Sequence, residues 1–546
     1  MEPYDVYLEI GREGKCMAHV PELPGCMVRA ASQEEALAAL PQAIMDYHGW
    51  LRNHGEEVAP VTTVTLAVVE TVKGCGPFAH GDAAALFAPD RQPLGREELE
   101  LYLRRADCGR EDLLSLVQHL PDEVFEWQPQ EETMSIRSIL RHLGNAEEWY
   151  VSRLAPPQTL PPAWENDEAL PILSFLEMER RTAVERLRRL TDEERAQVIH
   201  PGHWSDHPDE AWTARKALRR LLEHQFEHTA QVRDALAARR RHFRARLIGN
   251  RAQLLYRLLG LDEETLHKQP VFADTTAVEL LAHVAAWDGL YTKRMKLVLE
   301  GRVEEIRGVE LDDRNAALHD QYKEWPLARA LQFFLEARRE FLQTLVRVGD
   351  GAWYRPLALP WGDTTSLVTW SLWRARHDAV HAADLLRWRQ ENRFTAAAGP
   401  RSLLVAALEA SRDEIAALVA LVPEAERRTR RLHGEGTLKD ILGHLADWEA
   451  FAVSCLRAGR LLELGYADEQ AHNEARAAAW RAQPWSQVTA AFAQVRQELL
   501  QIVAHQELAT PLPNPWGADT IYGWAHSFLA HERHHGAALR ATLVHL

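Results

Sequence analysis

Three pairs of histidines in the sequence have the spacing of metal ligands on one face of a helix. Within each pair, three residues separate the two histidines. A helix turns about 100° per residue, so side chains at positions i and i+4 lie on one face and two imidazoles can bind one ion. A single pair of this kind more often serves packing, but its occurrence three times in one chain favours metal binding. The pairs are His224 with His228, His377 with His381, and His531 with His535.

A lone histidine upstream of each pair can supply a third ligand. His142, His283 and His444 precede the first histidine of the corresponding pair by 82, 94 and 87 residues. Three imidazole nitrogens leave one or more coordination positions open to water or substrate, as in catalytic metal sites. We therefore predict three metal sites, each with three histidines. We expect zinc, and nickel, iron and manganese remain alternatives because they accept the same ligands.

Other side chains near the histidines are predicted to take supporting roles. Trp287 and Trp448 follow a lone histidine by four residues and could form a wall of the site, although an aromatic residue at helical spacing is more often part of a core. Asn315 and Asn473 stand near the start of a third helix, where we expect them to act as N-caps. His534 follows His531 by three residues and is expected to be a neighbour of the site rather than a ligand.

An acidic residue follows each lone histidine by five residues. This spacing places it about 140° around the helix from the histidine. We therefore expect surface or helix-contact residues rather than ligands at Glu147, Asp288 and Glu449.

Helical segments that repeat along the chain must position the histidines. Each lone histidine lies in a helical apolar pattern preceded by a hydroxyl residue that can act as an N-cap, namely Ser135, Thr276 or Thr437. Each histidine pair lies in a later apolar pattern. Further helices are expected from the remaining apolar patterns, which gives four helices per repeat and a four-helix bundle. These include 97–120, 246–261 and 402–422 as first helices, and 327–346 and 485–503 as later ones.

The segment before the repeats has a different pattern. The stretches 4–10, 16–20, 27–30 and 62–72 have the alternation or β-branched content of strands, and Ser32 with Glu35 can cap one helix between them. The fold class predicted is mainly α, with three tandem up-down four-helix bundles behind a small N-terminal α/β domain. The domains predicted are 1–72 for the α/β domain, 73–95 for a linker, and 96–243, 244–397 and 398–546 for the first, second and third bundles.

Composition narrows the functional classes. The net charge of −16 disfavours binding to nucleic acid or to an anionic membrane, because both need clustered cations. The basic run 239–242 is expected to be a solvated helix end. The five cysteines are scattered, and no apolar run approaches the roughly 20 residues of a membrane helix, so we expect a cytoplasmic protein. The sequence contains no phosphate-binding glycine loop, Gly-x-Ser-x-Gly elbow or Cys-x-x-Cys pair.

The histidine-bearing helices resemble the DinB-like (YfiT-like) superfamily. The resemblance is carried above all by ILGHLADWE around His444 and LLAHVAAWD around His283, and it extends from about residue 96 to the C-terminus. The motifs 312–315 and 468–473 make the second and third bundles most similar to the ClbS/DfsB branch. The resemblance implies a four-helix bundle, often dimeric, with a divalent metal bound by one histidine of the second helix and two of the last. It thus implies ligand roles for His142, His224, His228, His283, His377, His381, His444, His531 and His535.

The N-terminal segment resembles the HicB-like antitoxin fold. The residues that carry this resemblance are 20–26 and 32–37. Proteins of that fold neutralise a small RNase toxin and usually carry a DNA-binding tail, but here the bundles take the place of the tail. We therefore expect this domain to recruit a protein partner rather than to neutralise a toxin.

Characterised relatives of the bundles are thiol transferases, isomerases and a hydrolase, so membership alone does not fix the reaction. We predict a divalent-metal-dependent enzyme, either a hydrolase or a thiol S-transferase. It would act on a small molecule, with a low-molecular-weight thiol as one candidate, through a metal-bound hydroxide or thiolate. No protein nucleophile is assigned. The alternative is a non-catalytic metal-binding stress-response or scaffold protein whose HicB-like domain recruits a partner.

Overall fold

The computed structural model describes most of the chain. The described residues are 3–75, 83–128, 133–154, 170–202, 205–394, 398–422, 426–427, 431–432, 436–514 and 516–544. They form two compact parts, Met1–Leu236 and Ala237–Leu546. The fold is mainly α with a small N-terminal mixed sheet, as predicted. Among these residues, no helix is both long enough and apolar enough to cross a membrane.

The N-terminal domain is a four-stranded sheet with one long helix. The strand order is β3-β2-β1-β4, and β1 pairs antiparallel with β2 and parallel with β4. The side chain of Ser32 caps α1 (Gln33–Asn53), as its sequence position predicts. The strands are β1 Tyr4–Gly11, β2 Cys16–His19, β3 Met27–Ala30 and β4 Leu66–Cys75. Strand β4 therefore extends past residue 72 into the segment predicted as a linker, and part of that segment, 76–82, lies outside the described residues.

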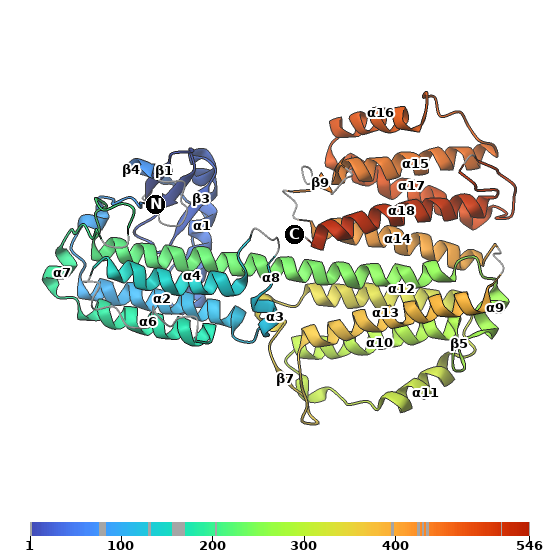
Figure 1. Ribbon diagram of the computed structural model, residues 1–546, viewed down its shortest axis with the longest axis horizontal. Helices are drawn as coiled ribbons and strands as arrows, with labels where there is room; N and C mark the ends of the chain where they lie inside the picture. Colours follow the sequence, from blue (N-terminus) through green and yellow to red (C-terminus); the bar gives the residue numbers. More distant parts are fainter. Residues whose placement is uncertain are drawn as a thin grey trace. The chain divides into compact units, whose positions relative to one another are not determined.

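The first bundle packs against this domain. Its core includes Leu99, Leu103, Leu218 and Leu222, which are all nearly inaccessible to solvent. Figure 1 shows α1 next to the first part of α8. Phe226 of α8 joins the two, because its ring lies against Trp50 of α1 at a centroid distance of 4.9 Å. The helices are α2 Arg96–Val117, α3 Asp122–Phe125, α4 Ile136–Ser152, α6 Ile172–Arg189, α7 Asp192–Ala196 and the first part of α8 Ala214–Leu258.

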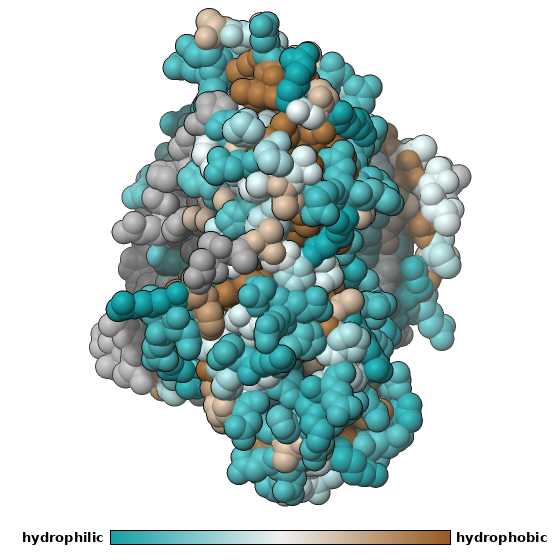
Figure 2. Space-filling view, turned by 90° about the vertical axis from the view of Figure 1, so that its right-hand side faces the viewer, coloured by the Kyte–Doolittle hydropathy of each residue, from teal (hydrophilic) through white to brown (hydrophobic). Residues whose placement is uncertain are grey.

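The second and third bundles share one continuous hydrophobic core, and α12 packs against α14. The second bundle consists of the end of α8, α9 Glu263–Lys268, α10 Ala277–Leu299, α11 Leu311–Tyr322, α12 Leu327–Val346 and α13 Leu367–Asn392. The third consists of α14 Arg401–Leu421, α15 Leu438–Ala458, α16 Glu469–Ala482, α17 Trp485–His505 and α18 Ile521–Val544. On the face shown in Figure 2, hydrophilic side chains predominate and hydrophobic ones are visible between them.

The predicted caps of the lone-histidine helices are confirmed. Ser135, Thr276 and Thr437 accept hydrogen bonds from the backbone N–H groups at the third positions of α4, α10 and α15. In α10 and α15 the residue at that position, Glu279 or Asp440, returns a hydrogen bond and completes a capping box. These caps fix where each helix starts and therefore where its histidine lies along the bundle.

The prediction for the basic run 239–242 is wrong. It was expected to be a solvated helix end, but these residues lie within the uninterrupted helix α8, which also passes through the predicted bundle boundary at 243/244. The physical reason is the local sequence. Between Ala214 and Leu258 there is no proline and only one glycine, Gly249, so strong helix formers continue through the junction.

Candidate metal centres

The structure brings the nine predicted histidines together as three triads. In each triad the Nε2 atoms lie close together, and the first histidine of the pair is the central one. His224 Nε2 is 3.1 Å from His142 Nε2 and 3.0 Å from His228 Nε2. The corresponding distances from His377 are 3.1 and 3.2 Å, and those from His531 are 3.0 and 3.1 Å. The ligand atoms of each triad lie within 4.8 Å of one another.

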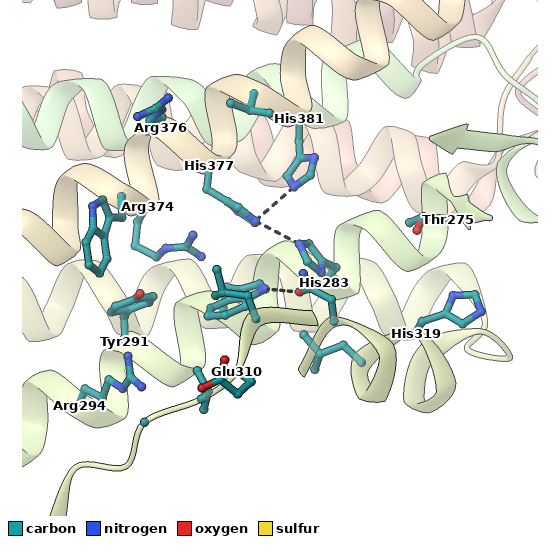
Figure 3. A pocket seen from close by; sticks show the side chains of 18 of the residues that line it. Thr275, His283, Tyr291, Arg294, Glu310, His319, Arg374, Arg376, His377 and His381 are labelled. Atoms are coloured by element: carbon teal, nitrogen blue, oxygen red, sulfur yellow. Dashed lines mark hydrogen bonds between the residues drawn. The ribbon is translucent and has the colours of Figure 1, made fainter. Parts of the chain in front are cut away.

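Two helices build each triad. The lone histidine comes from α4, α10 or α15, and the pair comes from α8, α13 or α18 at positions i and i+4. Figure 3 shows the second triad, in which His377 points between His283 and His381. His534, expected to be a neighbour, lies with its ring centroid 5.3 Å from that of His535 and is not part of the third triad.

Burial keeps triad histidines neutral. It lowers the pKa of His283 to about 3 and that of His531 to about 3, and it also lowers the pKa of His377. Positive charge nearby also lowers these pKa values. A proton on one histidine of a triad would disfavour a proton on its neighbours. At neutral pH these imidazoles therefore offer lone pairs rather than positive charge, which is the state that binds a metal.

The nitrogen spacing fits one divalent ion per triad. Three nitrogens bound to one ion at about 2.1 Å in a tetrahedral arrangement are about 3.4 Å apart. The two distances from the central histidine of each triad, 3.0 to 3.2 Å, are close to this value. In two of the histidines, the Nδ1 atom, which is not part of the triad, lies beside a side-chain oxygen. His228 Nδ1 lies 2.7 Å from Gln231 Oε1, and His381 Nδ1 lies 3.2 Å from Asp384 Oδ2. Such bonds fix the ring orientation and the tautomer of a ligand. The donor set thus fits the predicted cofactor, and metal binding itself stays a prediction.

A buried arginine–carboxylate network lies in each bundle, and the sequence prediction missed it. Glu147, Asp288 and Glu449, expected at the surface or at helix contacts, are buried helix contacts. Asp288 Oδ2 lies 2.5 Å from Arg251 Nη2 of α8 and 2.8 Å from Arg338 Nε of α12. The equivalent arginines are Arg110 and Arg180 around Glu147, and Arg412 and Arg496 around Glu449.

The network reaches the histidine pair through the residue that follows its first histidine. Arg338 Nη2 donates to Asp378 at 2.7 Å, and Arg496 Nη2 donates to Glu532 at 3.0 Å. In the first bundle Gln225 accepts from Arg180 at 2.9 Å. These bonds connect all four helices and limit rotation of the helix that presents the pair. A repeated spacing could have revealed the network, because the arginine of the first helix precedes the acid by 37 residues in all three bundles.

The two predicted wall tryptophans are held by the asparagines predicted as caps. Trp287 Nε1 donates to Asn315 Oδ1 at 3.2 Å, and Trp448 Nε1 donates to Asn473 Oδ1 at 2.8 Å. The cap prediction is wrong, because α11 begins at Leu311 and α16 at Glu469, where Asp468 is the N-cap. The asparagines therefore lie inside their helices and face the indoles.

The second and third triads each border a cavity. A cavity of about 970 Å³ in the second bundle is lined by His283, His377 and His381, and Trp287 forms part of its wall. A smaller cavity of about 340 Å³ in the third bundle is lined by His444 and His535. Trp448 lies 6.4 Å from the His444 ring but is not among the residues that line this smaller cavity.

Comparison with protein families identifies the bundles. A model of the DinB superfamily matches residues 106–232, 246–385 and 407–539, which together make up more than half of the chain. The chain belongs to the DinB superfamily, with three tandem copies of its domain and histidine triads that could bind metal. No curated protein matches the chain, and no solved structure does. The N-terminal domain lies outside the matched ranges, and its HicB-like character stays a prediction.

Proposed function

We propose that this protein is a divalent-metal-dependent enzyme that acts on a small molecule in the cavity of the second bundle. The observation that carries the proposal is the position of the second triad, whose three histidines line a cavity of about 970 Å³. This volume is at the upper end of the range of small-molecule sites. The reaction class proposed is hydrolysis or thiol transfer, and the proposed metal is zinc.

The residues around the second triad have distinct roles in this proposal. His283, His377 and His381 would hold the ion. A bound divalent ion supplies Lewis-acid chemistry, which lowers the pKa of water or a thiol. Trp287, fixed by Asn315, gives the substrate a rigid apolar wall. Trp361 and Trp373, each more than two-fifths exposed, add apolar surface that can shield a bound substrate from water.

Elemental analysis tests the proposal. We expect about three divalent ions per chain in the wild-type protein and about one fewer in each of the single variants His228→Ala, His381→Ala and His535→Ala. The metal-loaded protein is then assayed against thiols paired with electrophiles and against hydrolysable esters and amides. Turnover that His381→Ala abolishes would support the enzyme. Tight metal binding with no turnover would favour the non-catalytic alternative, and absence of metal uptake would refute both.

A further inference from the structure

Arg374 is a buried cation in the wall of the second cavity. It lies on α13, three residues before His377, and is 4% exposed. Its Nε and Nη1 atoms are buried and make no hydrogen bond with the residues that the structure describes. Figure 3 shows its side chain extending toward the space next to His283 and His377, whereas Arg376, which also lines the cavity, points away from the triad. Burying two guanidinium nitrogens without hydrogen-bond acceptors is costly, so their presence calls for a partner.

The protein groups around Arg374 do not neutralise it. The rings of Tyr291 and Trp287 lie 5.1 and 5.7 Å from its guanidinium carbon and provide cation–π contact but no acceptor. The nearest buried carboxylates, Asp288 and Asp378, already bind Arg251 and Arg338. Three buried guanidiniums thus share two carboxylates, so this buried cluster carries one positive charge in excess.

The other two bundles show that neither the fold nor the triad requires this arginine. The equivalent position, three residues before the first histidine of the pair, is Leu221 in the first bundle and Phe528 in the third. Both bundles still form a triad and a buried arginine–carboxylate network. An arginine that neither the fold nor the triad requires, in the wall of the second cavity, is best explained by what enters that cavity.

We propose that Arg374 binds the carboxylate of a small organic monoanion whose apolar or aromatic body lies against Trp287 and Tyr291. This inference rests on the proposed function and specifies its substrate class. The guanidinium offers paired N–H donors that match a carboxylate. The lining contains equal numbers of acidic residues and arginines, so it carries no large positive charge and a phosphate dianion fits less well. They are Glu279, Glu310 and Asp363, and Arg294, Arg374 and Arg376. The carboxylate would anchor the substrate one helical turn from the triad.

A pair of probes that differ only in charge tests the proposal. The full-length protein is freed of metal with a chelator, so that the probe cannot bind a metal ion, and its affinity for 3-phenylpropanoate and 3-phenylpropanamide is measured by ligand-observed NMR titration. We expect the carboxylate to bind at least about tenfold more tightly than the amide. Arg374→Met should remove this preference, and Arg374→Lys should restore part of it. Arg339→Met, which removes an exposed cation of the same bundle that is not among the residues lining the cavity, should change the preference by less than about threefold.

The outcomes separate this inference from the proposed function. Equal binding of the two probes, no saturable binding of either, or a preference that persists in Arg374→Met would overturn the carboxylate site, whether or not the protein takes up metal. The wild-type comparison does not depend on the folding of a variant. An Arg374-dependent preference in a protein that takes up no metal would leave the carboxylate site standing and refute the metal-dependent function.

Discussion

The indole nitrogen of Trp448 on α15 donates a hydrogen bond to Oδ1 of Asn473 on α16, across 2.8 Å. Trp287 and Asn315 make the same contact between α10 and α11. In both bundles the contact ties the helix that carries the lone histidine to a helix at the cavity. It therefore fixes the tryptophan and the adjoining helix relative to the triad.

Asn473→Ala should destabilise the α15–α16 contact. The indole N–H of Trp448, which is 8% exposed, would lose its partner, at a cost of about 1–3 kcal/mol. Hydrogen exchange of α16 amides measures the change as a loss of protection. The exposed Gln470 of the same helix provides the control, because Gln470→Ala removes only a surface bond to Glu474. Equal exchange in the two variants would contradict the predicted role of Asn473.

Arg496→Met should destabilise the third bundle much more. The substitution leaves the buried acids Glu449 and Glu532 with one fewer counter-charge each, and breaking a buried ion pair costs about 3–5 kcal/mol. Calorimetry should show a lower unfolding temperature. The quadruple variant Arg412→Met, Arg496→Met, Glu449→Leu, Glu532→Leu should recover part of the loss, because it leaves neither an unpaired acid nor an unpaired arginine there. A quadruple variant less stable than the single one would show that the charges are not the reason.

The N-terminal domain should lose stability as pH rises. Burial would lower the pKa of His19, but the carboxylates of Glu223 and Glu9 outweigh it and raise that pKa above 6.5. A raised pKa contributes stability that is present below 6.5 and is lost as pH rises through the folded value. Burial would raise the pKa of Glu9, but its attraction to His19, 3.5 Å away, prevails and lowers that pKa to about 2, so the contribution of Glu9 is lost as pH falls from 4.5 toward 2.

Hydrogen exchange of β1 and β2, corrected for the intrinsic effect of pH, checks this prediction. Protection should be highest between about pH 4.5 and 6.5 and should fall on either side. His19→Gln should flatten the decrease above pH 6.5. If the wild-type protein and His19→Gln respond equally to alkaline pH, a different group is responsible.

Metal addition should stabilise the helices that carry the triads. An ion that binds only the folded state at one hundred times its dissociation constant contributes about 2.7 kcal/mol. Zinc should therefore slow exchange in α10 and α13, and a chelator should reverse the effect. In the variant His381→Ala the effect should disappear from these two helices and persist in α15 and α18. Stabilisation of α10 and α13 that survives His381→Ala would exclude the second triad as its source.

The sequence predicted the triads better than their surroundings. The histidines could be found because three copies of one spacing restrict the ligand choice more than a single copy does, and Ser135, Thr276 and Thr437 marked the helix starts. Contacts between helices are not visible in the spacing along one helix. For this reason the acids five residues after the lone histidines were placed at the surface or at helix contacts, and their arginine partners were missed. Asn315 was misassigned because its helix begins four residues earlier, at Leu311.

The continuity of α8 was not predicted either. The histidine pattern separates the first and second bundles and predicts a boundary between them. No local signal stops the helix there, so it continues from Ala214 to Leu258. Proline and a C-terminal cap are the local signs that a helix ends, and the junction between the two bundles has neither.

The repetition of the triad has a consequence for how this protein can evolve. The ligand cage and the charge network recur in all three copies, while the position three residues before the histidine pair holds leucine, arginine or phenylalanine. A substitution at that position can change the cavity of one bundle and leave the histidine triads of the other two bundles intact. Because one gene encodes them in a single chain, the three centres are always produced in equal number, and divergence among them requires no adjustment of expression.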